Sequence, residues 1–223
     1  MDRRKDFDWG PVIRREFYLD DAVTVARRLL GMVLVCRSPD GDAFGRIVET
    51  EAYAGRDDAA CHSYGRPAPT GLHRTDVMFG TGGHAYVYLI YGMYDCFNVV
   101  ANVQGEPEAA LIRAIEPLGG LDLMASRRGT SERRRLCSGP GKLCMALGIT
   151  RDMNGADLCD GEKIFIAGGN DGINEADISA TPRINVDYAG DASAYPYRFA
   201  LRDSGFLSTR RFMPASPSRR RER

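Results

Sequence analysis

A short stretch of the sequence combines two carboxylates with an aromatic ring. In the run GRIVETEAY, which spans 45–53, Glu49, Glu51 and Tyr53 occupy alternate positions. Successive side chains of a β-strand point to opposite faces, so these three would share one face with Ile47. A glutamate on such a strand, beside an aromatic ring, can act as a general base. The spacing does not distinguish Glu49 from Glu51, and a surface strand with salt bridges would show the same pattern.

A second stretch, 86–98, is rich in tyrosine and reads YVYLIYGMYDCFN. Its Gly92-Met93 pair indicates a chain reversal, which places Tyr91 at the tip of a β-hairpin. Alternating tyrosines normally indicate a half-buried sheet, but a ring at a hairpin tip has no core to join and suits insertion between base steps. Six rings could line one pocket: Tyr53, His62, Tyr86, Tyr88, Tyr91 and Tyr94. The carboxylates and the rings together indicate a nucleobase pocket equipped to cut a base from its sugar.

Motifs for metals and phosphates are weak in this chain. The histidines, His62, His73 and His84, lack HxxxH or HExxH spacing, and no cysteines form a CxxC pair, so we expect neither a metal nor a cofactor. The segment 138–142, SGPGK, lacks the glycine and the Ser or Thr that a phosphate loop requires. Its backbone N–H groups could still bind a DNA phosphate. Lys142 is the only lysine near it, which argues against a Schiff-base lyase.

The overall composition suits one substantial core. A chain of 223 residues buries roughly 70 to 75% of its unfolded surface. Thirty basic and thirty acidic residues cancel, so any site for a polyanion must come from local clusters. Arginines gather in 127–135 and 219–223, whereas 152–177 is acidic. This pattern indicates one face toward phosphates and one that avoids them, although ordinary solvated charge runs would look alike.

The sequence carries no export or membrane signal. The segment 2–8 is charged and lacks the apolar core of a signal peptide, and no apolar run reaches the length of a membrane span. Six cysteines without paired spacing suit free thiols in a reducing compartment. We therefore expect a non-secreted, cytoplasmic protein that does not contact membranes.

The elements that must position these residues follow an α+β pattern. Asp20 can cap a helix that runs to about Leu30, and a long ordered loop spans 56–83. Strands are expected at 32–36, 44–53, 86–91, 94–103, 108–115, 163–167, 183–186 and 197–201, and short helices at 118–127 and 142–147. We expect a single compact domain, 1–212, with a mostly antiparallel curved sheet, flanking short helices and a protruding β-hairpin. A basic, disordered tail, 213–223, would follow.

Several of these motifs, in this order, resemble the alkyladenine (3-methyladenine) DNA glycosylase family. The resemblance rests on GRIVETEAY, His62, YVYLIYGMYDCFN, LIRAIEPL at 111–118 and LCSGPGKLC at 136–144, and it covers about 25–207. Separated motifs in the right order are more specific than any one of them. Nothing in the chain resembles the helix-hairpin-helix glycosylases.

The resemblance implies a monofunctional glycosylase that initiates base excision repair. It would flip alkylated or deaminated purines out of duplex DNA and hydrolyse the N-glycosidic bond. Candidate bases are 3-methyladenine, 7-methylguanine, hypoxanthine and etheno-adenine. Glu51 would be the general base that deprotonates water, and Arg113 would help to hold that water. The carboxylate would also stabilise an oxocarbenium-like transition state. The expected partner is double-stranded DNA containing damaged purines, bound by a nucleoid-associated monomer.

The resemblance also implies how the base is held. Tyr53 would stack on one face of the extruded base, and His62 with Tyr88 on the other. A purine alkylated at N3 or N7 is cationic, so electron-rich rings attract it, and it is a better leaving group. Asn98 would clash with the 2-amino group of normal guanine and so exclude it.

The remaining implied roles concern the duplex. Tyr91 would enter the minor groove and fill the space left by the flipped nucleotide, supported by Met78, and Lys142 would contact DNA. The segment 102–108 and His84 depart from the family pattern. These departures concern which damaged purines the protein prefers.

Two other classes of function remain open. A nucleosidase could use the same carboxylate and rings on free modified purine nucleosides, but it would have no use for Tyr91. A non-catalytic nucleic-acid-binding module could use its tyrosines only to stack bases. Comparing activity on free nucleosides with activity on duplex DNA distinguishes a nucleosidase from a glycosylase. Release of a base distinguishes both enzymes from a binding module.

Overall fold

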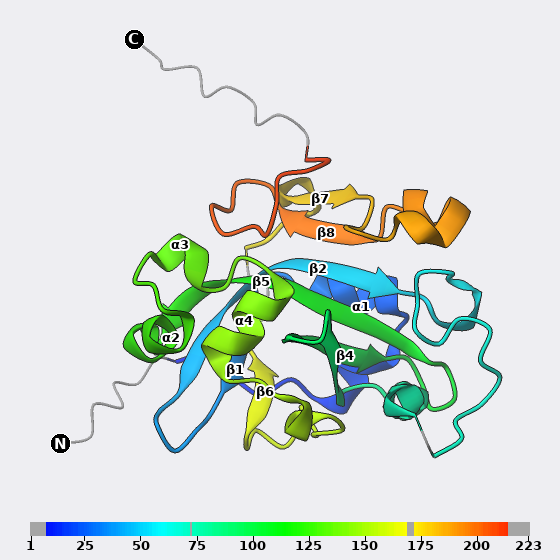
Figure 1. Ribbon diagram of the computed structural model, residues 1–223, viewed down its shortest axis with the longest axis horizontal. Coiled ribbons are helices and arrows are strands. Elements are labelled where there is room, and N and C mark those ends of the chain that lie inside the picture. The colour runs from blue at the N-terminus through cyan, green and yellow to red at the C-terminus, as the bar shows by residue number, and fades with distance from the viewer. Residues whose placement is uncertain (1–7, 72, 169–171, 214–223) are drawn as a thin grey trace, which may run out of the picture.

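An open antiparallel sheet forms the centre of the molecule (Figure 1). The computed structural model describes residues 8–71, 73–168 and 172–213. The strand order is β3-β4-β5-β2-β1-β6, and β8, paired with β7, joins β2. The strands are β1 (Val33–Cys36), β2 (Ala43–Tyr53), β3 (Ala85–Ile90), β4 (Tyr94–Ala101), β5 (Glu108–Gly119), β6 (Ile164–Ala167), β7 (Ile178–Thr181) and β8 (Arg198–Leu201). The expected α+β class with an antiparallel sheet is confirmed.

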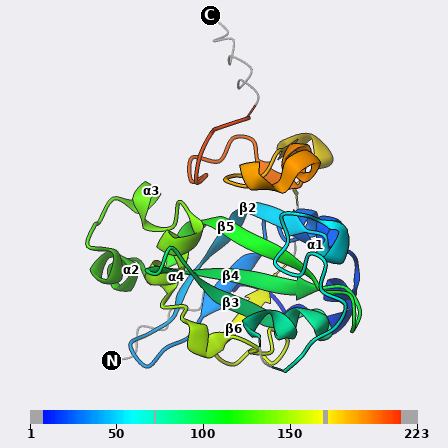
Figure 2. The same ribbon diagram turned by 45° about the vertical axis from the view of Figure 1, so that its right-hand side comes forward.

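Short helices cover this sheet. They are α1 (Ala22–Arg28), α2 (Leu121–Arg128), α3 (Arg133–Leu136) and α4 (Pro140–Leu147). Single turns of 3-10 helix lie at Arg15–Leu19, Gly55–Asp57, Arg74–Phe79, Arg151–Met153, Glu175–Asp177 and, in two merged turns, Asp187–Ala194. Figure 2 shows α2, α3 and α4 gathered beside one another, away from α1. None of the helices in the described part of the chain is long and apolar enough to cross a bilayer.

Strand β2 is the element on which the sheet depends. One edge pairs with β5 along most of its length, while the other edge pairs first with β1 and then, at Glu49–Glu51, with β8. The β2–β5 register shifts on both sides of Glu49. Such an irregularity bends a strand and breaks simple alternation. Ile47 accordingly packs in the main hydrophobic core, whereas Glu49 and Glu51 share a cluster of charges, so the expectation that Ile47 lies with the glutamates was wrong.

Strands β3 and β4 form the expected hairpin. They pair from Ala85 and Val99 to Ile90 and Tyr94, and the turn carries Tyr91 at its tip. Tyr91 and Gly92 have φ of 53° and 70°, and the Met93 N–H donates to the Ile90 carbonyl. Two successive positive φ angles are what a type I′ turn requires. The Tyr91 side chain is 75% exposed, so this ring does point away from the core.

One expected strand does not exist. Residues 183–186 are irregular, and the strand in this region is β7, which ends before Pro182. Proline disrupts a ladder because it has no N–H. The Ile184 N–H donates to a side chain instead of a neighbouring strand, and Asn185 has a φ of 61°. The segment is therefore shaped by contacts with side chains rather than by a sheet.

Other differences from expectation are small. The first helix is capped by Asp21, not Asp20, and the helix expected at 118–127 begins at Leu121. The loop 56–83 contains two short 3-10 turns, and its residue 72 lies outside the described residues. The expected disordered tail lies outside them too, apart from Met213.

The cap of α1 can be tested. The Asp21 carboxylate accepts the Thr24 N–H (3.0 Å) and the Thr24 hydroxyl (2.8 Å). Replacing Asp21 by alanine should lower the free energy of unfolding by about 1 kcal/mol. Asp20→Ala removes only an exposed pair with Arg28 and should cost less. Equal losses in denaturant unfolding would contradict the assignment of Asp21 as the cap.

The contribution of Asp21 should depend on pH. Partial burial acts to raise the pKa of Asp21, but the hydrogen bonds from Thr24 lower it, and the net shift is downward. A lowered carboxyl pKa means stability that is present above about pH 4 and is lost as the pH falls through the folded-state value. The difference between the native protein and Asp21→Ala should therefore shrink when unfolding is repeated in acid.

Candidate active site

A cavity of about 370 Å³ opens beside the hairpin, on the side of the sheet where α4 begins. Its volume lies within the roughly 300–1,000 Å³ of small-molecule sites. Strands β3, β4 and β5 provide one wall, and the irregular segment 184–188 provides another. The side chains expected to hold a base all line it: Tyr53, His62, Tyr88 and Asn98. Arg113 and Tyr91 line it as well.

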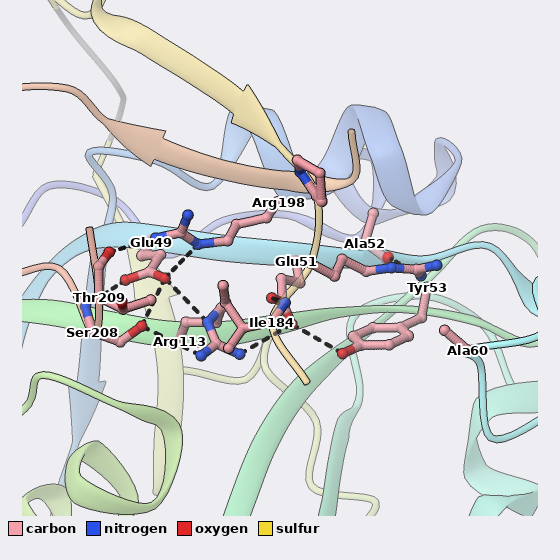
Figure 3. Close-up of polar contacts among 12 residues, drawn as sticks. Glu49, Glu51, Ala52, Tyr53, Ala60, Arg113, Ile184, Arg198, Ser208 and Thr209 are labelled. Carbon is pink, nitrogen blue, oxygen red and sulfur yellow. Dashed lines mark hydrogen bonds and ion pairs between the residues drawn. The ribbon is translucent and has the colours of Figure 1, made fainter. Parts of the chain in front are cut away.

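Glu51 is fully buried behind the residues that line this cavity, and Figure 3 shows its polar contacts. Its carboxylate accepts three hydrogen bonds, from the Tyr53 hydroxyl (2.9 Å), Arg113 Nη1 (3.1 Å) and the Ile184 N–H (2.7 Å). All three donors belong to residues that line the cavity. A carboxylate can accept about four hydrogen bonds, so Glu51 retains capacity for one more donor, such as a water.

Glu49 lies in a different environment. It is fully buried and accepts four hydrogen bonds: Arg113 Nε (3.1 Å), Arg198 Nε (2.8 Å), the Ser208 N–H (2.6 Å) and the Ser208 hydroxyl (2.8 Å). Three of these bonds reach Oε1 and one reaches Oε2, and of the three donor residues only Arg113 lines the cavity. The two glutamates, which the sequence left equivalent, differ in the structure, because all three donors to Glu51 belong to residues that line the cavity, whereas only Arg113 among the donors to Glu49 does.

Arg113 lies between the two glutamates. It is 8% exposed, and its guanidinium contacts Glu49 through Nε and Glu51 through Nη1, each at 3.1 Å. Burial alone would lower the pKa of Arg113, but Glu51 and Glu49 raise it, so the guanidinium stays charged. An arginine fork suits this geometry because its donors are fixed in one plane.

Tyr53 acts as a donor rather than an acceptor. Burial and then the negative charge of Glu51 raise the pKa of Tyr53 well above its usual value, so the hydroxyl stays protonated. Behind the ring, the Arg183 guanidinium lies 4.9 Å from its centroid. Arg183 is itself paired with Asp58, with Nη2 at 2.8 Å from Oδ1. This pair holds the Tyr53 ring in place from behind.

The aromatic wall opposite is built around Tyr88. The His62 and Tyr88 ring centroids are 4.6 Å apart in an edge-to-face arrangement, and His62 Nδ1 is 2.9 Å from the Tyr86 hydroxyl. His62 is exposed at its outer edge, but burial of the ring and then the charge of Arg74 lower its pKa below 6.5. At neutral pH the ring is therefore uncharged and does not repel a cation.

The other expected site residues differ in burial: Asn98 and Met78 are buried, whereas Lys142 is exposed. Asn98 is 3% exposed and fixed by a hydrogen bond from Nδ2 to the Tyr86 carbonyl (3.0 Å). Lys142 is exposed in the first turn of α4, next to Pro140 and Gly141 of the cavity wall. Met78 is 1% exposed, lines the cavity and packs among the rings, and its expected support of Tyr91 stays a prediction.

The arginine-rich segment 127–135 is partly structural. Arg127, Arg128 and Arg133 donate to backbone carbonyls around α2, α3 and α4. Arg134 and Arg135 are exposed. The second arginine cluster, 219–223, lies outside the described residues. Only part of the expected positive charge is therefore free to face a polyanion.

Sequence reasoning missed the groups that the chain brings in from its C-terminal third. These are the Ile184 N–H, Arg183, Arg198 and Ser208. A backbone N–H carries no residue-type signal, so Ile184 could not have been found. Arg198 is different, since an arginine that begins an apolar strand and is fully buried must be paired. Within the described ranges, no three His, Cys, Asp or Glu side chains converge as a metal site would require.

Comparisons with known proteins agree on one family. The family model for methylpurine-DNA glycosylase matches residues 16–205. A protein of Methanocella arvoryzae is 48% identical over 202 residues, which are 90% of this chain and 97% of that protein. One of Desulfitobacterium hafniense is 45% identical over 204 residues, covering 88% and 98%. Both carry the name "Putative 3-methyladenine DNA glycosylase".

The pair behind Tyr53 can be tested through stability. Arg183 and Asp58 have side-chain exposures of 0% and 1%, so Asp58→Asn would leave a buried charge unpaired. We expect the free energy of unfolding to fall by about 3–5 kcal/mol. Asp157→Asn is the matched control, because its pair with Arg15 is partly exposed, at 40% and 27%, and should cost at most about 1 kcal/mol. Similar losses in the two variants, measured by denaturant unfolding, would contradict this account.

Proposed function

Because the chain belongs to the methylpurine-DNA glycosylase family, whose members hydrolyse N-glycosyl bonds, we propose that it removes alkylated or deaminated purines from duplex DNA. The observation that carries the proposal is the position of Glu51. Its carboxylate is held by three donors that line a cavity of aromatic rings, next to an exposed tyrosine on a hairpin. Such a reaction needs a carboxylate, a cavity that accepts a base, and a side chain that fills the gap left by the flipped nucleotide.

In the proposed reaction, Glu51 takes a proton from water while the water oxygen attacks C1′ of the flipped nucleotide. The electrons of the C1′–N bond pass to the base, so a cationic base leaves as a neutral molecule. The carboxylate also stabilises the positive charge that develops on the sugar. Arg113 lines the cavity 3.1 Å from Glu51 and is placed to hold the attacking water.

The cavity suits a cationic purine better than a normal one. Tyr53 and Tyr88 stay protonated, and His62 is uncharged at neutral pH, so the three rings are neutral and present electron-rich surfaces to a cationic base. Asn98 is rigidly held in the wall, and in the proposal it excludes the 2-amino group of guanine. We infer that the cationic bases 3-methyladenine and 7-methylguanine are substrates. Hypoxanthine and etheno-adenine would be substrates that carry no charge.

The hairpin supports action on a duplex rather than on free nucleosides. Tyr91 is 75% exposed and is held by a turn with two positive φ angles. A large ring fixed in that way is suited to fill the gap left by a flipped nucleotide. Lys142 and the exposed arginines, Arg134 and Arg135, are candidates for phosphate contacts.

The role of Glu51 is tested with Glu51→Gln. We expect the single-turnover rate of base release from a duplex bearing one 7-methylguanine to fall by about 10²–10⁴-fold, because amide and carboxylate differ in basicity but not in size. Affinity for the duplex should be retained. Glu116→Gln is the matched control, since Glu116 lies on β5 beside Arg133 and away from the cavity. Release at the native rate by Glu51→Gln would remove the basis of the proposal.

The same assay separates the alternatives. Mild alkali should break the strand at the lesion far more in the duplex treated with protein than in the untreated duplex, and free 7-methylguanosine should be turned over far more slowly than the duplex. Faster turnover of the free nucleoside would favour a nucleosidase. Tight binding to the lesion with no released base, by a protein with Glu51 intact, would favour a binding module.

The role of Tyr91 in extruding the base is tested with Tyr91→Ala. We expect base release from the duplex to slow by about 10- to 100-fold, because the ring no longer replaces the flipped base in the stack. Release from a single strand bearing the same lesion should change much less. Tyr64→Ala is the control, since Tyr64 is also exposed, at 58%, but does not line the cavity. Equal slowing on single and double strands would contradict a role in extrusion.

A further inference from the structure

Four buried charges lie together next to the cavity (Figure 3). Glu49, Glu51 and Arg198 are 0% exposed and Arg113 is 8% exposed. Two carboxylates and two guanidiniums balance, as a buried cluster of charges requires. Only Glu51 and Arg113 have a role in the proposed reaction. Glu49 and Arg198 lie behind them, and neither residue lines the cavity.

Glu49 connects this cluster to the segment that follows β8. The segment Ser208–Arg211, which we call the C-terminal clamp, is fastened to it at several points. The Ser208 N–H and hydroxyl donate to Glu49, and Arg113 Nη2 lies 3.3 Å from the Ser208 hydroxyl. Arg198 donates to the Thr209 carbonyl (2.7 Å) and the Arg211 carbonyl (3.0 Å).

The position of Arg113 depends on these contacts. Its Nε is held by Glu49 and its Nη2 by Ser208, which leaves Nη1 alone for Glu51. Without Glu49, the guanidinium would be free to turn its full fork toward Glu51, since a bidentate pair is the geometry that arginine and carboxylate prefer. A Glu51 engaged in that way would have less capacity to accept a proton from water.

We propose that Glu49 is a positioning residue for base removal: with the C-terminal clamp it fixes Arg113, so that Arg113 contacts Glu51 through a single nitrogen and leaves that carboxylate able to accept a proton. The proposal rests on the proposed role of Glu51. It gives Glu49, the first glutamate of the GRIVETEAY run, a part in the reaction without contact with substrate, and it makes residues 208–211 part of the active site.

The proposal is tested with Glu49→Gln, which keeps the size of the side chain but removes its charge. At saturating protein, we expect the single-turnover rate of 7-methylguanine release from a duplex to fall by about 10²-fold, because a misplaced catalytic group costs that much. Affinity for the same duplex should not change, since Glu49 lies behind the cavity wall. A smaller fall, of about 2- to 10-fold, is expected for Ser208→Ala, which removes one hydroxyl and no charge.

The matched control is Glu108→Gln. Glu108 is a partly buried glutamate with two hydrogen bonds, from the Ala22 N–H (2.6 Å) and Asn102 Nδ2 (3.1 Å), and it is not part of the cavity. This variant should be less stable yet release the base at the native rate. All variants are assayed below their unfolding midpoints, so that loss of fold is separated from loss of rate.

Two results would overturn the proposal. One is a folded Glu49→Gln, or a folded Ser208→Ala if the first does not fold, that releases the base at the native rate. The other is a parallel loss of rate and duplex affinity, which indicates a general distortion of the site. Failure of the underlying function is distinguishable, because then the native protein releases no base or Glu51→Gln is as active as the native protein.

Discussion

The pairing of buried carboxylates with buried guanidiniums is the interaction on which this structure depends. An uncompensated charge inside a protein is strongly destabilising, and the fully buried Glu51 is paired with Arg113 at 3.1 Å. The charges come from three strands: β2 carries the glutamates, β5 carries Arg113 and β8 carries Arg198. Because β2 pairs with β5 on one edge and with β8 on the other, the sheet order itself brings them together.

The same strand arrangement determines where a base could lie. Pairing of β1 with β2 ends at Arg46, which leaves the same edge of β2 open to β8 at Glu49–Glu51. Beyond β7, the chain then crosses over the end of β2 as the segment 184–188, which closes the cavity opposite the hairpin. The backbone of this segment supplies a hydrogen bond to Glu51 where a strand would have bonded to its neighbour. An irregular connection is thus as necessary to the site as the regular elements around it.

Local patterns predicted the parts of the fold that depend on local physics. The hairpin, its exposed Tyr91 and most strands follow from alternation and turn residues, and the structure confirms them. Properties that depend on distant partners could not be predicted in this way. Glu49 and Glu51 look alike until Ser208 and Ile184 are placed beside them. Residues 183–186 alternate as a strand would, yet their hydrogen bonds go to side chains, and Met78 is buried by rings far from it in sequence.

The hydrogen bond between Glu49 and Ser208 joins residues 159 positions apart, and it has a consequence for how the protein comes into being. Contacts of such long sequence separation form slowly, and this one requires nearly the whole chain to have left the ribosome. A nascent or prematurely terminated polypeptide lacks this contact and therefore the complete charge cluster. Completion of the charge cluster is in this way coupled to the synthesis of residue 208, long after the hairpin of β3 and β4 has been made.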